Sequence, residues 1–258
     1  MATVLEARNL NKSFGAVTAA AELNVQIEQD SVVGLIGSNG AGKTTFINIV
    51  TGYLTPTSGQ ILYLGREITG LKPRQITELG ICRSFQIPQL FNSLSVSENL
   101  AVGVGIAARS GRRDAADRGQ PAQVEQLIER FNLKGYASQV AGQLPEGVRK
   151  LLDIAMAVAG RPKLLLLDEP TSGVSAEEKF RLMDMVMGAL TAEGVTVLFV
   201  EHDMDIVGRY THRVLAFYEG RIIADGDPAA VLKDAEVRRY VIGGQIHPVN
   251  KEGAGAAD

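Results

Sequence analysis

Tryptophan is absent from this sequence of 258 residues, and cysteine occurs once, at Cys82. A single cysteine cannot form a disulfide within the chain, so a reducing compartment is expected. No run of apolar residues approaches the ~20 residues that a membrane-spanning helix needs, and the N-terminal residues lack a signal-peptide pattern. These absences predict a cytoplasmic protein without a membrane span of its own.

The chain also lacks a large excess of charge of either sign, because it has 26 basic and 29 acidic residues. A net charge of −3 argues against binding to nucleic acid through bulk electrostatics. Arginines at the start of segment 109–120 could contact lipid or a partner, but aspartates stand beside them. That mixture favours a solvated surface loop, and the Gly/Ala-rich tail 244–258 is expected to be flexible.

Glycine is in excess, with 28 residues against a usual share of about 7%. Short apolar runs bounded by turn residues predict strands, and longer stretches predict helices. The expected strands cover residues 4–7, 23–27, 31–36, 60–64, 164–167, 195–200 and, as a hairpin around Glu219-Gly220, 214–218 and 221–224. The expected helices cover residues 43–50 and 176–189, the latter with a capping box of Ser175 and Glu178, a largely helical stretch 93–160, and a helix opening at Asp227-Pro228. This order indicates an α/β core with a helical insertion.

Residues 37–44 fit the pattern G-x-x-x-x-G-K-[ST] over their whole length. They join a buried strand to a helix, where backbone N–H groups and the helix dipole can face phosphate oxygens. Lys43 supplies a point charge for the β- and γ-phosphates, and the Thr44 hydroxyl can bind Mg²⁺. The residues expected to bind nucleotide here are Gly37, Ser38, Asn39, Gly40, Ala41, Gly42, Lys43, Thr44 and Thr45. The motif therefore predicts a ligand with β- and γ-phosphates, together with Mg²⁺.

An acidic pair follows the buried strand 164–167. Asp168 stands at the carboxyl end of this strand, where open α/β sheets bind ligands, and can hold Mg²⁺ through water. Glu169 is placed to polarise the attacking water. Apolar strands that end in acidic residues also occur at ordinary loops, but the phosphate motif earlier in the chain favours a catalytic role for this pair.

With four further elements, these motifs resemble the ATP-binding subunit of an ABC transporter over roughly residues 4–243. Phe14 resembles the aromatic residue that stacks on adenine, and Gln86 the glutamine that reaches Mg²⁺ and water. His202 resembles the switch histidine that contacts the γ-phosphate, and residues 144–148 stand at the family signature. Taken singly, Phe14 suits a core position, Gln86 a surface and His202 a structural role, but their order favours the site.

The resemblance implies an ABC nucleotide-binding domain, that is, an α/β P-loop NTPase core with an N-terminal antiparallel β subdomain and an inserted helical subdomain. The implied core covers residues 1–86 and 161–243, and the helical subdomain covers residues 87–160. The implied partners are a second ABC ATPase subunit, two membrane permease subunits and, indirectly, a periplasmic or extracellular solute-binding protein. The chain would lie peripherally on the cytoplasmic face of the inner or plasma membrane, without a nucleic-acid partner.

Segments 80–100, 200–204 and 237–243 resemble one branch of the family, the ATPases of branched-chain and hydrophobic amino-acid importers. The implied function is ATP hydrolysis that powers import of branched-chain or other amino acids, or of related small amides or carboxylates. Two alternatives stay open: the ATPase of a lipopolysaccharide-type exporter, and a regulatory cassette that mainly clamps ATP. The length and mild acidity disfavour a soluble ABC ATPase of DNA repair or translation.

The family signature Leu-Ser-Gly-Gly-Gln is degenerate in this chain. The corresponding residues are Leu144, Pro145, Glu146, Gly147 and Val148. Pro145 has neither a hydroxyl nor an N–H for the γ-phosphate of a partner's ATP, and Glu146 adds negative charge there. The helix is expected to persist with Pro145 at its first position. Because the residues acting within the subunit match the family, we favour an asymmetric heterodimer; the alternatives are a homodimer and a branch that tolerates a varied signature.

Overall fold

The structure is a computed structural model that describes residues 2–109 and 119–243. The strands are β1 Thr3–Phe14, β2 Val17–Glu28, β3 Val32–Gly37, β4 Ser58–Tyr63, β5 Arg66–Glu67, β6 Ile81–Ser84, β7 Leu164–Asp168, β8 Thr196–Val200, β9 Arg213–Tyr218 and β10 Arg221–Gly226. The α-helices are α1 Lys43–Val50, α2 Pro73–Leu79, α3 Val96–Arg109, α4 Gln120–Arg130, α5 Glu146–Val158, α6 Ala176–Thr191, α7 Met204–Tyr210, α8 Pro228–Val231 and α9 Ala235–Val237. Most of the expected loop 109–120 and the whole tail 244–258 lie outside the described residues.

The strands form two sheets, which confirms the expected α/β fold with an antiparallel N-terminal part. The antiparallel sheet has the order β2-β1-β4-β5, and the larger sheet has the order β10-β9-β3-β8-β7-β6. From β9 to β6 the neighbours in the larger sheet run parallel, and β10 adds an antiparallel edge. The carboxyl ends of the parallel strands therefore meet at one edge, where ligands of such sheets bind.

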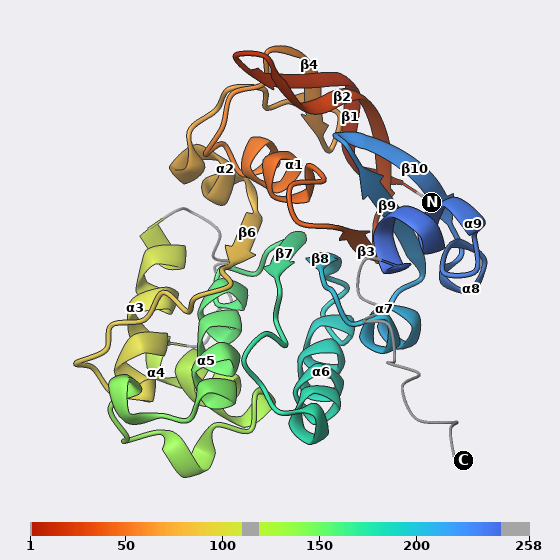
Figure 1. Cartoon of the computed structure of the whole chain (residues 1–258). Coiled ribbons are helices and arrows are strands. Elements are labelled where there is room, and N and C mark those ends of the chain that lie inside the picture. Colours follow the sequence, from red (N-terminus) through yellow and green to blue (C-terminus); the bar gives the residue numbers. More distant parts are fainter. Residues whose placement is uncertain (1, 110–118, 244–258) are drawn as a thin grey trace, which may run out of the picture.

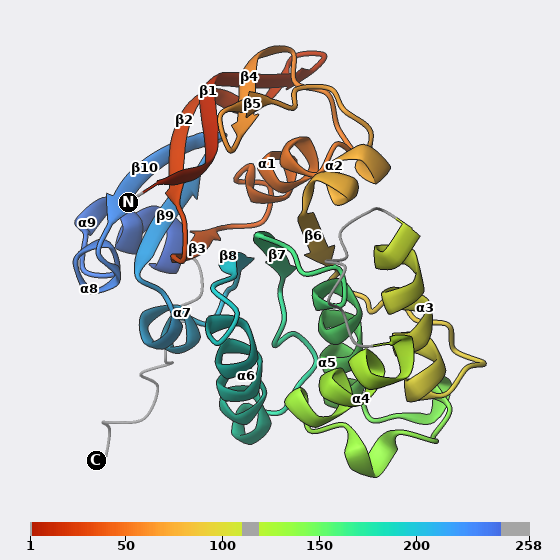
Figure 2. The same cartoon turned by 180° about the vertical axis from the view of Figure 1, so that it is seen from behind.

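The larger sheet is buried on both faces, because its parallel strands are apolar on both sides. Leu164 and Leu166 face the cluster that contains α1 and the antiparallel sheet, whereas Leu165 and Leu167 face the cluster that contains α3 to α7. Figures 1 and 2 show α1 between the two sheets, with α5, α6 and α7 on the other side. The sheet thus fixes the phosphate motif and the acidic pair on one rigid support.

The expected elements are present, with differences at some of their ends. Helix α1 has the expected bounds, and β1 and β2 extend well beyond the expected cores as a long antiparallel ribbon. Strand β6, which pairs with β7, has no counterpart in the expectations. The turn between β9 and β10 has φ of 46° at Glu219 and 76° at Gly220, the left-handed pair that a tight hairpin needs.

Two expectations about helix starts were wrong. Ser175 is the N-cap of α6, but its hydroxyl bonds the carboxylate of Glu178 at 2.9 Å and makes no capping bond to the backbone. The two side chains satisfy each other, so neither reaches the backbone N–H that a capping box requires. Pro145 is the N-cap of α5 and not its first residue, because Glu146 already has the helical conformation.

Within the described ranges, no helix has the length and apolar character needed to cross a membrane.

Candidate functional site

The phosphate motif lies between β3 and α1, where the chain leaves the buried sheet and enters a helix. Gly42 is the N-cap of α1 and has φ of 109°, which favours glycine. A Cβ on Gly42 would lie 2.6 Å from the carbonyl oxygen of Ala19 and 3.2 Å from Cα of Gly220. The amide of Gly220 donates to the carbonyl of Ala41 at 2.9 Å. The loop is therefore held directly against the β9–β10 turn, and a side chain at Gly42 would break this contact.

Lys43 is 5% exposed and points back along the inside of the loop. Its Nζ donates to the carbonyl oxygens of Gly37 at 2.5 Å and Ser38 at 3.0 Å. Burial lowers the pKa of Lys43, and the carboxylates of Glu169 and Asp168 act in the opposite direction. The ammonium is thus placed at the floor of the loop, within the field of both acidic residues.

Asp168 at the end of β7 is paired with a cation from the neighbouring strand. Its Oδ2 lies 2.5 Å from Nη2 of Arg83 on β6, and Nη1 of Arg83 donates to Oδ1 of Asn48 on α1 at 2.7 Å. The side chains of Arg83 and Asp168 are 9% and 13% exposed. This pair uses Oδ2 of Asp168, so Oδ1 is the oxygen through which Asp168 can meet a ligand.

Glu169 is held on both carboxylate oxygens. Nε2 of Gln86 donates to its Oε2 at 2.7 Å, and Nε2 of His202 lies 2.9 Å from its Oε1. The backbone of Glu169 has φ of 49°, a region that residues with a Cβ rarely adopt. The structure therefore brings together three residues that the sequence singled out separately, and it fixes the direction of the Glu169 carboxylate.

A cavity of about 130 Å³ is lined by residues 39–45 together with Glu169 and His202. The phosphate motif and Glu169 thus share one space at the carboxyl edge of the sheet, whereas Asp168 is not part of its lining. Phe14 is outside this lining: it ends β1, is 51% exposed, and its ring centroid lies 5.0 Å from Nζ of Lys12. Its exposure leaves part of the ring open to a ligand, beside the Lys12 ammonium, but does not place it at the phosphates.

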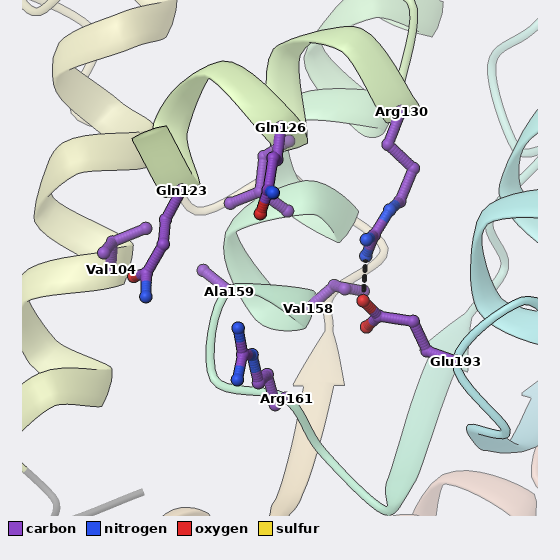
Figure 3. Close-up of a pocket in the computed structure, with 9 residues that line it drawn as sticks. Val104, Gln123, Gln126, Arg130, Val158, Ala159, Arg161 and Glu193 are labelled. Carbon is purple, nitrogen blue, oxygen red and sulfur yellow. Dashed lines mark ion pairs between the residues drawn. The ribbon is translucent and has the colours of Figure 1, made fainter. Parts of the chain in front are cut away.

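Another pocket, shown in Figure 3, lies far from these residues, between α4, α5 and the turn after α6. Nη1 of Arg130 and Oε1 of Glu193 form an ion pair across it at 2.5 Å. Its volume of about 30 Å³ holds at most about two water molecules. We therefore exclude it as a nucleotide site and regard it as a packing gap where the helical part meets the core.

The signature segment is also separate from the cavity. Leu144 is buried, whereas the side chain of Glu146 is 48% exposed and its Oε2 lies 3.9 Å from Nε of Arg149. Arg149 also donates to the carbonyl oxygen of Ala141 and to Oδ1 of Asn92. The negative charge of Glu146 is thus partly balanced by a cation one turn later in α5.

Sequence reasoning did not identify several buried charged residues beneath this edge. Oε1 of Glu201 accepts from the amide and hydroxyl of Thr171 at 2.9 and 2.6 Å, and its Oε2 accepts from the amide of His202 at 3.1 Å. This carboxylate fixes the loop after Glu169 relative to the loop that carries His202. The signal in the sequence is an acidic residue at the end of an apolar strand.

Asp153 and Lys150 on α5 were also missed. Asp153 accepts from the hydroxyl of Ser84 at 2.7 Å and from the amide of Gln89 at 2.9 Å, and burial raises the pKa of Asp153. Both residues stand among apolar neighbours on the buried side of α5. The signal in the sequence that could have identified them is a charged residue inside an apolar helical run.

The sequence model of the family described as "ABC transporter" matches residues 20–172. The chain belongs to the ABC transporter family. As an ATPase cassette of this family, it binds ATP, hydrolyses it, and forms the ATP-binding subunit of a transporter.

Relatives of this ABC cassette match along nearly the whole chain. It is 33% identical to the high-affinity branched-chain amino acid transport ATP-binding protein BraF of Pseudomonas aeruginosa, over 93% of this chain and 98% of that protein. It is 34% identical to the probable branched-chain amino acid transport ATP-binding protein LivG of Archaeoglobus fulgidus, over 94% and 96%. The ADP conformation of MJ1267, an ATP-binding cassette of an ABC transporter, is similar with a TM-score of 0.81 and 31% identity, over 93% and 98%.

Proposed function

We propose that this cassette powers an importer of branched-chain or other amino acids, or of related small amides or carboxylates. The support is the branched-chain amino acid transport function of the relatives, which match over more than nine-tenths of both chains. The structural observation that carries the hydrolytic role is the position of Glu169. Its carboxylate is held by Gln86 and His202 at the cavity lined by the phosphate motif.

The nucleotide phosphates would lie in the loop from residue 37 to residue 45. Backbone N–H groups at the start of α1 and the ammonium of Lys43 would contact phosphate oxygens, in place of the carbonyls that Lys43 now contacts. Phe14 would stack on adenine with its exposed ring. These contacts hold the γ-phosphate in line for attack by water.

The oxygen donors near the loop fit Mg²⁺, which prefers a few hard protein ligands together with phosphate oxygens and water. The proposed ligands are the Thr44 hydroxyl, the Gln86 amide oxygen and, through water, Asp168. The Gln86 amide nitrogen bonds Glu169, so its oxygen is the atom left for a metal. A bound Mg²⁺ supplies charge neutralisation at the β- and γ-phosphates.

In the proposed reaction, Glu169 orients the attacking water and accepts its proton. His202 would donate to the γ-phosphate region and holds Glu169 in place. Lys43 stabilises the charge that moves to the leaving group. The Gln86 side chain links this chemistry to the helical residues that follow it.

The proposed assembly is a dimer of cassettes bound to two permease subunits on the cytoplasmic face of the membrane, with a solute-binding protein outside. Residues 1–86 and 161–243 would form the catalytic core, and residues 87–160 the helical subdomain that carries motion to the permeases. The segment from Leu144 to Val148 would face the partner's nucleotide. Because Pro145 has no N–H and Glu146 is acidic, we favour a heterodimer in which the partner supplies the better signature.

The test of this function uses the complex purified through a tag on this chain and placed in proteoliposomes. Uptake of labelled leucine, isoleucine and valine should require ATP, and Glu169→Gln should lower ATP turnover about 100-fold or more. Glu236→Gln on exposed α9 is the matched control and should leave turnover unchanged. Turnover at the original rate in Glu169→Gln would contradict the catalytic role, and absence of uptake of all three would contradict branched-chain amino acids as the substrates.

The proposed asymmetry is tested by replacing the catalytic glutamate of each cassette in turn. We expect Glu169→Gln to abolish most turnover and the partner's substitution to have the smaller effect. If Glu169→Gln leaves turnover intact while the partner's substitution abolishes it, the asymmetry is the reverse of the one proposed. Recovery of two identical cassettes would show that the dimer is homomeric.

A further inference from the structure

Lys150 lies near the start of α5 and is 3% exposed. Its ammonium donates to two backbone carbonyls, that of Glu169 at 3.0 Å and that of Gln86 at 3.3 Å. A buried ammonium bound to neutral acceptors is unfavourable in free energy compared with an apolar side chain of similar length. Packing alone therefore gives no reason for a lysine here. Its two acceptors belong to the two residues whose side chains meet in the candidate site.

Carboxylates on several elements surround the ammonium without pairing directly with it. Burial lowers the pKa of Lys150, whereas the carboxylates of Glu146, Glu201, Glu169 and Asp153 act in the opposite direction. The positive charge is therefore stabilised by carboxylates on α5, after β7 and after β8. This arrangement leaves the N–H groups of the ammonium available to the two carbonyls.

The backbone of Glu169 needs such support. Its φ of 49° is unfavourable for a residue with a Cβ, and such a conformation persists where the surroundings fix it. The Glu169 amide donates to the carbonyl of Val200 at 3.0 Å, and the Glu169 carbonyl accepts from the amide of Ser172 at 3.1 Å as well as from Lys150. Of these contacts, only the one from Lys150 comes from the helical part of the chain.

Helix α5 also holds the backbone around Gln86, whose side chain bonds the Glu169 carboxylate. Lys150 binds the Gln86 carbonyl, and one turn later Asp153 accepts from the amides of Phe85 at 3.2 Å and Gln89 at 2.9 Å. The backbone on both sides of Gln86 is thus tied to the same helix. A rotation of α5 away from the sheet would release Gln86 and the Glu169 carbonyl together.

We propose that Lys150 is a positioning residue for ATP hydrolysis. By holding the backbones of Gln86 and Glu169, it keeps the Glu169 carboxylate directed at the cavity over the phosphate loop. The signature segment, which would contact the partner's nucleotide, leads directly into α5. The position of α5 would therefore depend on the partner cassette, and through Lys150 it would affect hydrolysis of the ATP bound to this chain. The inference rests on the catalytic role proposed for Glu169.

The test compares Lys150→Met, which keeps the length of the side chain without its donors, with Lys150→Arg, which restores them. ATP turnover is measured in the purified complex, with the catalytic glutamate of any different second cassette replaced by glutamine. MgADP binding to the full chain is measured by calorimetry. We expect Lys150→Met to lower kcat about 10- to 100-fold. KM for ATP and Kd for MgADP should stay within about twofold, since the phosphate loop is untouched.

Lys150→Arg should recover most of kcat, because a guanidinium has enough N–H groups for both carbonyls. Lys134→Met removes an exposed lysine of the same helical part and should change nothing. The proposal is overturned if Lys150→Met keeps kcat within about twofold of the original. It is equally overturned if Lys150→Met and Lys150→Arg lose kcat and nucleotide affinity together, which is the pattern of a purely structural lysine.

Two further variants keep the outcome decisive. If Lys150→Met does not fold, Lys150→Gln is judged by the same criteria, since its shorter amide can reach at most one of the carbonyls. Glu169→Gln is assayed in the same preparation. Normal turnover in Glu169→Gln removes the proposed catalytic role and this inference with it. An inactive Glu169→Gln beside a fully active Lys150→Met removes this inference alone.

Discussion

Replacing Arg83 with methionine should destabilise the nucleotide-free chain through the carboxylate that it leaves behind. The guanidinium lies 2.5 Å from Asp168 and 2.7 Å from the side-chain oxygen of Asn48. With side-chain exposures of 9% and 13%, neither member of the ion pair can recover full hydration on its own. Arg83→Met therefore leaves a largely buried negative charge at the end of β7 without its ion-pair partner.

The magnitude follows from the burial. Removing one member of a fully buried pair lowers the free energy of unfolding by about 3–5 kcal/mol. The remaining exposure of Asp168 and the nearby ammonium of Lys43 reduce that loss, so we expect about 2–3 kcal/mol. With a urea m-value of about 3 kcal/mol/M, this corresponds to a midpoint that falls by about 0.7–1 M. In the double variant Arg83→Met/Asp168→Asn, the decrease in the free energy of unfolding should be smaller than the sum of the two single decreases by about 1–3 kcal/mol.

The assay is urea unfolding of the full chain without nucleotide, followed by circular dichroism. Arg74→Met is the matched control, because Arg74 forms a surface ion pair with Glu78 and its side chain is 88% exposed. We expect that control to change stability by less than about 0.5 kcal/mol. An Arg83→Met midpoint equal to that of the control, or a double variant equal to the sum of the singles, would refute this reasoning about the buried pair.

Three further predictions concern stability in the same assay. Asp227→Ala should lower the free energy of unfolding by about 1 kcal/mol, because the Asp227 side chain accepts two backbone N–H groups at the start of α8. Ser175→Ala should lower it by less than about 0.5 kcal/mol, because Ser175 makes no capping bond. Equal losses would contradict this assignment of the caps. Thr171→Val should lower the free energy of unfolding by about 1–3 kcal/mol, since it removes a hydroxyl that donates at 2.6 Å to the buried carboxylate of Glu201. A decrease no larger than that of a Thr→Val substitution at an exposed position would contradict this prediction. Burial raises the pKa of Asp153, so the stability of the original chain relative to Asp153→Asn should be highest below about pH 4 and should fall as pH rises through the native pKa. A relative stability that instead rises with pH over this range would reverse the sign.

Much of the fold was predictable because the apolar runs and the glycine motif act locally. The bounds of α1 follow from its position between the phosphate loop and Gly52, and β7 and β8 follow from apolar runs. Strand β6 was missed because it is four residues long and contains Arg83, which breaks the apolar pattern. The role of Arg83 becomes clear only in the sheet, where β6 lies beside β7 and Arg83 pairs with Asp168.

The candidate site divides in the same way. The phosphate loop, Asp168 and Glu169 were identified from contiguous motifs, whose chemistry depends on neighbours in the sequence. The contacts of Lys150 and Glu201 join residues 19 to 64 positions apart, and no local periodicity reports such a pairing. The capping box failed for a related reason: the spacing was right, but the two side chains bonded to each other.

The contact between the phosphate loop and the β9–β10 turn links the nucleotide site to the order of synthesis. Strand β3, which carries the loop, lies between β8 and β9 in the sheet, and Gly220 bonds Ala41 directly. The loop leaves the ribosome early, long before the strand and turn that support it. A chain stopped short of β9 therefore contains the whole phosphate motif without the strand and turn that support it. We therefore expect nucleotide binding only after the β9–β10 hairpin has been synthesised and has packed against β3.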